Sequence, residues 1–564
     1  MQINFICIIF VFTMYIDDCT YKTNGKTHRR ILLRNSQRVN GKVVKTTIAN
    51  LSDCTPTEIL AIKTALQHKD NFGQLEQIKN SEITNGKIIG PSIALCQIAQ
   101  SLGITDALGR NDKAGQVLWL IISRLIEPGS RLSAVRLANI HYGCEIIGIS
   151  QLNENILYSS LDWLYENKQT IENKLFANWK EKHGQTKNIF LYDVSSSYVE
   201  GDKNELATYG YNRDKKQGKK QIVYGLLTDE QGEPLGIEVF RGNTGDTSTV
   251  SAQIKKIKEQ FGCENITFVG DKGMIKSTQM DALSDEKFNY ITTITKPQIE
   301  KLLKEKVIQM ELFTGQMCEI EDTRTSTRYI LRRNPFRAEE IKQNRKARIT
   351  AIENKVTTIN EYLKEHPKAR IDVQNKNLAS HVEKLKLSSA ITIQQDEQER
   401  KISITANDEV LDEMSLLDGC YVMRTDLTKD EATKEVIHAR YKALAEVEWA
   451  FRTQKGLLEI RPLYLRKKER TIAHLEVCMI AYKIELYLRQ QWHDMDLTVE
   501  EGLKTLSMLS SIKIKTGENV IVKIPQPDEQ CKKLLKRIDV KMPTFLPDKK
   551  VDVVTYKKLT TARK

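Results

Sequence analysis

The sequence lacks the spacing patterns that structural zinc modules and membrane spans need. Its 10 cysteines include no Cys-x-x-Cys pair and no Cys/His cluster with zinc-ligand spacing, which argues against structural zinc. The most apolar run, residues 3–16, is short for a bilayer span and lacks the basic start and cleavage site of a secretory signal. No internal repeat or low-complexity tract is present. We therefore expect no membrane partner, and the scattered thiols indicate a reducing, cytoplasmic environment.

The composition predicts a soluble protein of several domains. The chain has 564 residues, 40% of them hydrophobic and 28% charged, so it is too long for one domain and too apolar to be disordered throughout. Lysine and arginine number 86 against 73 aspartates and glutamates, a net charge of +13. This excess favours a polyanionic partner, nucleic acid first and an acidic membrane surface second, while a merely basic protein is an equal alternative.

Changes in periodicity divide the chain into seven segments. A self-contained start at Met14 suggests that the residues before it are not native. Apolar residues spaced three and four apart then predict helices, which are typical both of DNA-binding and of packing modules. The predicted segments are residues 1–13 (extension), 14–90 (basic β module and linker helix), 91–182 (helical, DNA-end-binding), 183–296 (core, first part), 297–430 (insertion with a long charged helix and strands), 431–495 (core, second part) and 496–564 (C-terminal region).

Two aspartates stand at the ends of predicted strands. The apolar runs NIFLYD and ITFVGD each predict a short strand, and the strands end in Asp193 and Asp271. Either aspartate alone is more typical of a turn or a helix cap. Because ligands gather outside the carboxyl ends of strands in α/β sheets, the two carboxylates meet if their strands are neighbours. Mg²⁺ prefers oxygen ligands, and a third acidic group is needed to hold two such ions.

A single predicted helix, YKALAEVEWAFRTQKGL, supplies a third carboxylate. The residues that share one face of this helix, at about 100° per residue, are Tyr441, Glu448, Arg452 and Lys455. Glu446 points away from them. Glu448 therefore lies beside two cations that suit phosphate binding, although a Glu/Arg pair four residues apart is also common on protein surfaces.

These segments resemble the insertion-sequence DDE transposases over residues 187–295 and 418–490. The similar stretches are LYDVSSSYVEG, GKKQIVYGLLTDEQGEPLGIEVFRGNTGDTST, FVGDKGM and YKALAEVEWAFRTQKGLLEIRPLYLRKKERTIAHL. One branch of the family has a Tyr, Arg, Glu, Lys motif, to which Tyr441, Glu448 and Lys455 correspond. Leu444 stands where that branch has arginine, which puts the DNA contact made there, and full activity, in doubt. Arg452, on the same predicted helix face as Glu448, is the candidate to replace the arginine missing at Leu444.

The resemblance implies a ribonuclease-H-like α/β fold, a mixed β-sheet flanked by helices and interrupted by an α/β insertion before Glu448. It implies that Asp193, Asp271 and Glu448 hold two Mg²⁺ ions, for which Mn²⁺ can substitute. The implied activity is cut-and-paste transposition: binding of terminal inverted repeats, hydrolysis at the element ends and joining of the 3′-hydroxyls to target DNA. Double-stranded DNA is then the partner of a homodimer in a prokaryotic, nucleoid-associated setting. A hairpin intermediate is neither required nor excluded.

Further side chains are predicted to contact DNA, with a solvated surface or a packing role as the alternative for each. They are Tyr441, Arg452, Lys455, Lys272, Arg461, Arg466 and Lys467, with Trp449 as a base-stacking group. Two other functions stay open: a catalytically weakened, transposase-derived repressor, and a metal-dependent endonuclease without strand transfer. The terminal repeat, the target site and the true start codon are not specified by the sequence.

Overall fold

The computed structural model describes residues 13–23, 25–39, 42–67, 69, 82–184, 189–516, 519–547 and 549–555. The chain divides into two compact units, Met1–Gly86 with Ser510–Pro525, and Lys87–Leu509 with Gln526–Lys564. Residues 1–12, most of the predicted extension, lie outside the described residues.

The first unit contains two small sheets. In one, strands β1 (Thr13–Thr23), β2 (Lys26–Val39) and β3 (Lys42–Asn50) are antiparallel neighbours, and α1 (Pro56–Gln67) packs on them through Ile31, Leu51 and Ile59. The other has the order β17 (Asn519–Lys523), β16 (Ser510–Thr516), β4 (Glu82–Ile88). Strands β2 and β3 contain the two strand-like runs expected from the sequence, and β1 is a strand that the sequence pattern did not indicate.

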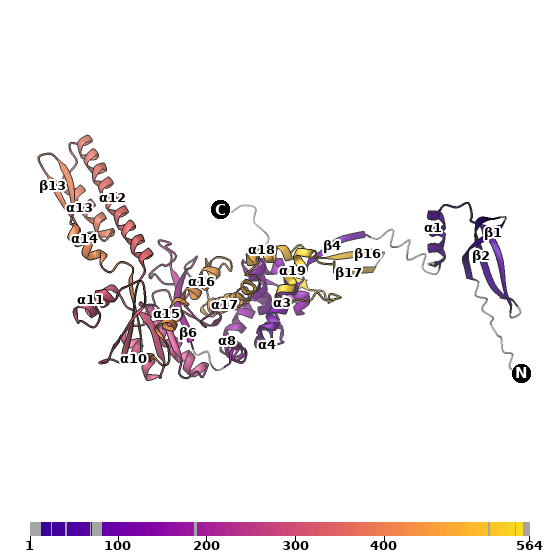
Figure 1. Ribbon diagram of the computed structural model, residues 1–564, viewed down its shortest axis with the longest axis horizontal. Helices are drawn as coiled ribbons and strands as arrows, with labels where there is room; N and C mark the ends of the chain where they lie inside the picture. Colours follow the sequence, from indigo (N-terminus) through magenta and orange to yellow (C-terminus); the bar gives the residue numbers. More distant parts are fainter. Residues whose placement is uncertain are drawn as a thin grey trace. The chain divides into compact units, whose positions relative to one another are not determined.

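Helices follow where the apolar spacing predicts them. Their bounds are α3 (Gly90–Ser101), α4 (Ile104–Leu108), α5 (Asp112–Ile126), α6 (Arg131–Leu137), α7 (Gly143–Ile147) and α8 (Glu154–His183). Asn111, Ser130 and Asn153 cap α5, α6 and α8 by accepting hydrogen bonds from backbone N–H groups of the first turn. Helices α5 and α8 pack on the long, buried helix α17 (Lys468–Gln491). Figure 1 labels α8 and α17 in this region.

The second unit is built on an eight-stranded mixed sheet with the order β11-β12-β15-β10-β9-β6-β7-β8. The bounds are β6 (Ile189–Tyr198), β7 (Gln221–Thr228), β8 (Pro234–Arg241), β9 (Thr267–Gly270), β10 (Asn289–Thr293), β11 (Cys318–Asp322), β12 (Thr327–Arg333) and β15 (Cys420–Thr425). Strands β6, β9 and β10 run parallel, and the flanking pairs are antiparallel. This sheet confirms the predicted mixed α/β fold.

Helices cover both faces of the sheet at β6. Tyr192 and Val194 point to one face and pack with α8, α9 (Asp246–Lys255), the π-helical turn η2 (Lys256–Gln260) and α10 (Ser277–Asp285). Because side chains of a strand alternate, Asp193 points to the opposite face. On that face Phe451 of α16 (Leu444–Lys455) meets Tyr224 of β7 edge-on, with ring centroids 5.5 Å apart.

The segment between β10 and α16 contributes to the sheet and also forms a body of its own. It begins with α11 (Lys296–Lys304) and the 3₁₀ turn η3 (Met310–Leu312), followed by β11 and β12. The elements between β12 and β15 are α12 (Pro335–Glu365), α13 (Ile371–Lys384), β13 (Ile391–Asp396), β14 (Lys401–Ala406) and α14 (Asp408–Ser415). They share a separate apolar core, and α12 and α13 lie side by side (Figure 1). The predicted domain limits stay predictions.

The remaining elements of the second unit are α15 (Lys434–Lys442), α18 (Val499–Leu506), α19 (Glu529–Arg537) and the short pair β5 (Gln151–Leu152) and β18 (Asp552–Val553). No helix among the described residues is long and apolar enough to cross a membrane.

Candidate active site

Asp193 and Asp271 lie at adjacent positions of two neighbouring parallel strands. Tyr192 of β6 pairs with Gly270 of β9, so the residue that follows each of these two is one of the aspartates. Strand β9 ends just before Asp271, as the sequence predicts. The predicted end of the other strand at Asp193 is wrong, because β6 continues to Tyr198 through backbone pairing with β7.

The carboxyl group of Asp193 is the electrostatic centre of the site. Its Oδ1 accepts a 2.7 Å hydrogen bond from the backbone N–H of Val194. The pKa of Asp193 is raised to about 7. Burial is the largest cause, the negative charges of Asp271 and Glu448 add to it, and the Val194 N–H and the Arg213 charge oppose it. The three predicted carboxylates therefore share one electrostatic neighbourhood, in which a cation would be favoured.

Tyr441 connects α15 to Asp271. Its hydroxyl lies 2.9 Å from Oγ1 of Thr293 on β10 and donates to Oδ1 of Asp271 at 3.4 Å. Oδ1 of Asp271 also accepts the backbone N–H of Lys272 at 2.7 Å. Burial raises the pKa of Tyr441 to about 12, so this hydroxyl keeps its proton and donates. Tyr441 thus positions an acidic group, and its predicted contact with DNA stays a prediction.

Glu448 is carried by α16, whose other side packs on the sheet. Val447, Ala450 and Phe451 of this helix are buried, and Glu448 itself is exposed. The prediction of one helix from Tyr441 onward is wrong: α15 ends at Lys442 and α16 begins at Leu444. Tyr441 and Glu448 therefore approach the aspartates from two successive helices rather than from one helix face.

Lys455 and Arg461 both form ion pairs with the buried carboxylate of Asp214. Asp214, whose side chain is 1% exposed, accepts a 2.8 Å bond from Nζ of Lys455 and a bond from Nη1 of Arg461. Oδ2 of Asp214 also accepts the backbone N–H of Tyr198 at 3.2 Å. These contacts fasten the loop after β6 to the end of α16. Since both cations are already paired, their predicted DNA contacts would have to replace or share this carboxylate.

The other predicted DNA contacts lie at the surface. Arg452, Lys272, Arg466 and Lys467 are exposed. Trp449 is 44% exposed, and the Arg489 guanidinium lies 5.2 Å from its ring centroid. The carboxylate of Glu446 lies 3.6 Å from the same Arg489 guanidinium.

Arg213 is a charged residue of the site that the sequence pattern did not reveal. Asp246 lies in a phrase similar to that of the family and is expected from the sequence to cap a helix, but Gly245 is the N-cap of α9 and no side chain caps it. Nη2 of Arg213 donates to Oδ1 of Asp246 at 2.6 Å, and the Arg213 charge lowers the pKa of Asp193. A Cβ on Gly273, two residues beyond Asp271, would lie 4.0 Å from Oδ2 of Asp246. The adjacent charges of Arg213 and Asp214 are visible in the sequence. Their role is not, because it depends on how the loop after β6 contacts Ser196 and Tyr198 of that strand.

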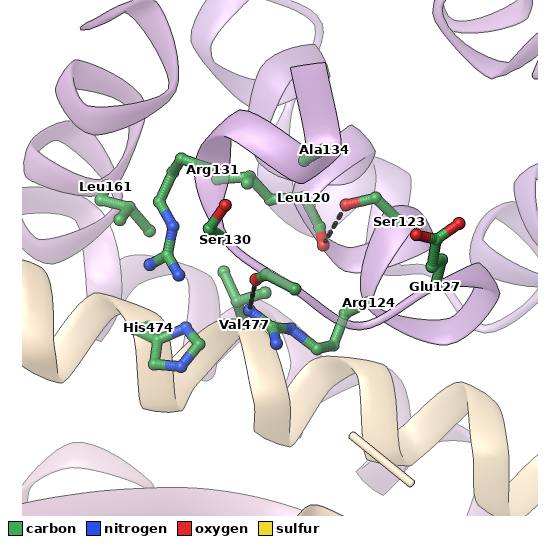
Figure 2. Close-up of a pocket in the computed structure, with 11 residues that line it drawn as sticks. Leu120, Ser123, Arg124, Glu127, Ser130, Arg131, Ala134, Leu161, His474 and Val477 are labelled. Atoms are coloured by element: carbon green, nitrogen blue, oxygen red, sulfur yellow. Dashed lines mark hydrogen bonds between the residues drawn. The ribbon is translucent and has the colours of Figure 1, made fainter. Parts of the chain in front are cut away.

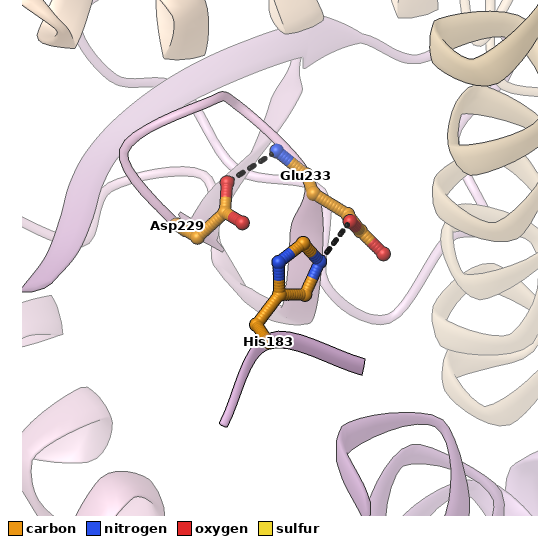
Figure 3. Close-up of side chains that lie close together, drawn as sticks. All are labelled: His183, Asp229 and Glu233. Atoms are coloured by element: carbon orange, nitrogen blue, oxygen red, sulfur yellow. Dashed lines mark hydrogen bonds and ion pairs between the residues drawn. The ribbon is translucent and has the colours of Figure 1, made fainter. Parts of the chain in front are cut away.

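A second acidic group lies elsewhere in the second unit. Within the described residues, one group of three side chains of metal-binding types has its ligand atoms within 4.8 Å of one another. It consists of His183, Asp229 and Glu233 (Figure 3). Asp193, Asp271 and Glu448 are not so tightly grouped.

The contacts of this second group account for it without a metal ion. The indole N–H of Trp179 donates to Asp229 at 3.0 Å, and Asp229 also accepts two N–H groups of the β7–β8 turn. Nζ of Lys483 donates to Glu233, and this attraction outweighs burial and lowers the pKa of Glu233. Glu233 already has the ammonium group of Lys483 as a partner. The three side chains therefore fit an anchor of the β7–β8 turn better than a metal site.

A small pocket beside α17 is lined by two arginines and His474 (Figure 2). Nη2 of Arg124 donates to the carbonyl of Gly129 at 3.0 Å, and Nη1 donates to the carbonyl of Leu458 at 3.4 Å. Burial, with Arg124 and Arg131 nearby, places the pKa of His474 well below its ordinary value. His474 is therefore a neutral packing residue, and Arg124 ties the helical region to the chain just after α16.

Two family models of transposases match the chain. A family model described as "Transposase DDE domain" matches residues 184–484, and a model described as "IS1634 family transposase, N-terminal domain" matches residues 18–80. Among solved structures, the chain is similar to a piggyBac transposase synaptic complex with hairpin DNA, at 7% identity, a TM-score of 0.36 and 70% coverage of each chain. No curated protein matches the chain.

Proposed function

The chain belongs to the insertion-sequence DDE transposases, which cut and join DNA, and from this premise we propose that Asp193, Asp271 and Glu448 form its catalytic site. The observation that carries the proposal is the placement of Asp193 and Asp271 directly after paired residues of two parallel strands, with the charge of Glu448 also acting on the buried Asp193 carboxyl. We further propose that the mixed sheet is a ribonuclease-H-like core. In this account the Tyr-Arg-Glu-Lys branch is represented by Tyr441, Glu448 and Lys455.

The donor set fits divalent metal ions, which this family uses. Carboxylate oxygens are the ligands that Mg²⁺ prefers, and in the part of the chain that the structure describes no cationic side chain lies at hydrogen-bond distance from these three. Bound there, Mg²⁺ would activate the attacking oxygen and neutralise the charge that develops on the phosphate. Asp193, Asp271 and Glu448 would hold the ions, and Mn²⁺ would substitute.

The surrounding residues fix the three carboxylates. The N–H of Val194 orients Asp193, and the hydroxyl of Tyr441 orients Asp271. Helix α16 is held at its C-terminal end by the contacts of Lys455 with Asp214 and of Arg124 with the carbonyl of Leu458. Such preorganisation lowers the cost of bringing the reacting groups together.

DNA recognition belongs to the same proposal. The chain would bind the terminal inverted repeats of its own element, hydrolyse the bond at each end and join the 3′-hydroxyls to target DNA, acting as a homodimer because two ends are handled together. Arg452, Lys272, Arg466 and Lys467 are exposed cations that would contact phosphates in a salt-dependent way.

Cleavage of DNA that carries the inverted repeats flanking the coding region tests the proposal. With Mg²⁺, wild type should cut at the repeat ends and give joined products. Asp193→Asn, Asp271→Asn and Glu448→Gln should each slow cutting by at least about a hundredfold, since metal assistance is worth several kcal/mol. Glu446→Gln, on the same helix but facing Arg489, is the matched control and should cut like wild type.

The outcomes separate the alternatives. Binding of the repeats without cutting in Mg²⁺ or Mn²⁺ would indicate a repressor. Cutting without joined products would indicate an endonuclease. Full cutting by any of the three carboxylate variants would refute the site.

A further inference from the structure

The loop between β6 and β7, residues 199–220, carries two strongly exposed aromatic rings. Tyr209 is 64% exposed and Tyr211 is 82% exposed. Apolar ring surface in water is unfavourable, and exposed rings set among polar groups are typical of interaction sites.

Cations accompany these rings. Cζ of Arg213 lies 5.7 Å from the ring centroid of Tyr211, and Nζ of Lys220 lies 6.0 Å from that of Tyr209. The stretch from Tyr209 to Lys220 holds five basic residues, Arg213, Lys215, Lys216, Lys219 and Lys220, and one acidic residue, Asp214. Asp214 is neutralised by Lys455 and Arg461. A basic surface with exposed rings fits nucleic acid, because the rings stack on bases and the cations bind phosphates.

The loop reaches the edge of the candidate active site. The backbone N–H of Arg213 donates to Oγ of Ser196 at 3.2 Å, three residues beyond Asp193 on the same strand. The Arg213 guanidinium is bonded to Asp246 at 2.6 Å. Asp246 in turn lies beside Gly273, two residues beyond Asp271, because a Cβ on Gly273 would be 4.0 Å from its Oδ2. The ring of Tyr211, next to the same guanidinium, therefore stands at the edge of the site.

Several contacts hold this loop in place. Nε2 of the buried Gln221 donates to the carbonyl of Tyr211 at 3.0 Å and to the carbonyl of Gly242 at 2.8 Å. The backbones of Gly210 and Gly242 touch, since a Cβ on Gly210 would lie 2.1 Å from the Gly242 carbonyl oxygen. The exposed rings therefore stand on an ordered support, which lowers the entropy lost when a ligand binds.

We propose that Tyr211 and Arg213 bind the DNA strand next to the scissile phosphate, Tyr211 by stacking on an unpaired base and Arg213 by contacting a backbone phosphate. The proposal rests on the proposed function, because it places this strand at Asp193, Asp271 and Glu448. An unpaired base is specified because the face of a base inside a duplex is covered by its stacked neighbours. Asp246 holds the guanidinium at the site until a phosphate competes for it.

The test follows the fluorescence of 2-aminopurine placed on either side of the cleavage position in a terminal-repeat duplex. The full chain is mixed with this DNA in Ca²⁺, to observe binding, and the unlabelled duplex is cut in Mg²⁺. The variants are Tyr211→Ala, Tyr211→Phe and Arg213→Ala. Tyr362→Ala is the matched control, because Tyr362 is an exposed tyrosine of α12, 42% exposed and stacked on His366. Melting temperatures verify that each variant is folded.

Wild type, Tyr211→Phe and Tyr362→Ala should quench the probe, and Tyr211→Ala should not. Tyr211→Ala should also cut about ten- to a hundredfold more slowly, the usual effect of losing one stacked base. Arg213→Ala should bind more weakly, with a salt slope smaller by about one. Unchanged quenching and cutting by folded Tyr211→Ala would refute the proposal and point to a protein partner for this loop. Tyr211-dependent quenching without cutting by wild type would refute the proposed function alone, and absence of both would refute both.

Discussion

Replacing Glu485 by glutamine should stabilise the protein at alkaline pH. Glu485 lies in α17, the helix that supports α8, α16 and β8, and its side chain is 4% exposed. Its Oε2 is buried without a hydrogen-bond partner. Burial raises the pKa of Glu485 from 4.5 to about 7, against a smaller opposing effect of Arg489. The folded protein therefore holds this carboxyl protonated at pH values where the unfolded chain has released the proton.

The sign and the size of the effect follow from this difference. Below pH 4.5 the group is protonated in both states and costs nothing. Between pH 4.5 and about 7 the unfolded chain binds fewer protons, so the free energy of unfolding falls as the pH rises. The total loss is about 3 kcal/mol, at about 1.4 kcal/mol for each unit of pKa difference. Above pH 7 the loss stays constant.

Urea unfolding followed by tryptophan fluorescence measures this effect in the second unit, which contains all five tryptophans of the chain. Glu485→Gln should match wild type at pH 4 and exceed its stability by about 3 kcal/mol at pH 8. Glu166→Gln, at an exposed position of α8, should stay within about 0.5 kcal/mol of wild type throughout. A Glu485→Gln variant that is no more stable than wild type at pH 8 would refute the reasoning.

Two further changes test how the loop after β6 is supported. Asp214→Asn leaves Lys455 and Arg461 without their shared carboxylate, so it should lower the free energy of unfolding in urea by about 3 kcal/mol and slow cutting. Asp202→Asn, at an exposed position, should do neither. Equal stability of the two variants would contradict the ion-pair account. Gly242→Ala should lower the melting temperature, because its Cβ would lie 1.9 Å from the carbonyl oxygen of Gln221, while Gly245→Ala, with nothing within 4 Å, should not; equal melting of the two would show that the close approach is absent.

Local signals in the sequence were sufficient for the mixed sheet. The apolar runs around Phe190 and Phe268 have the strand period, and both strands lie where they were expected. The end of the first strand was missed because β6 continues through residues 195–197, three serines that are polar in sequence yet buried where the strand pairs with β7. Burial of small hydroxyl residues depends on tertiary pairing, which local pattern does not report.

The break between α15 and α16 was missed for a similar reason. The residues around Ala443 are good helix formers, so propensity favours one continuous helix. The chain instead turns there, which lets the hydroxyl of Tyr441 reach Thr293 and Asp271. The roles of Lys455, Arg461 and Arg213 depend on the loop that carries Asp214, and a contact across more than 200 residues leaves no local signature.

The most direct test of the account is metal-specificity rescue at the aspartates. Asp193→Cys and Asp271→Cys should be inactive in Mg²⁺ and regain cutting of the terminal-repeat DNA in Mn²⁺, because a thiolate is a poor ligand for the hard Mg²⁺ ion. Glu446→Cys should cut in both metals. Recovery in Mn²⁺ is the result that the account predicts. Equal activity of the aspartate variants in both metals, or none in either while melting shows that they are folded, would contradict direct coordination by Asp193 and Asp271.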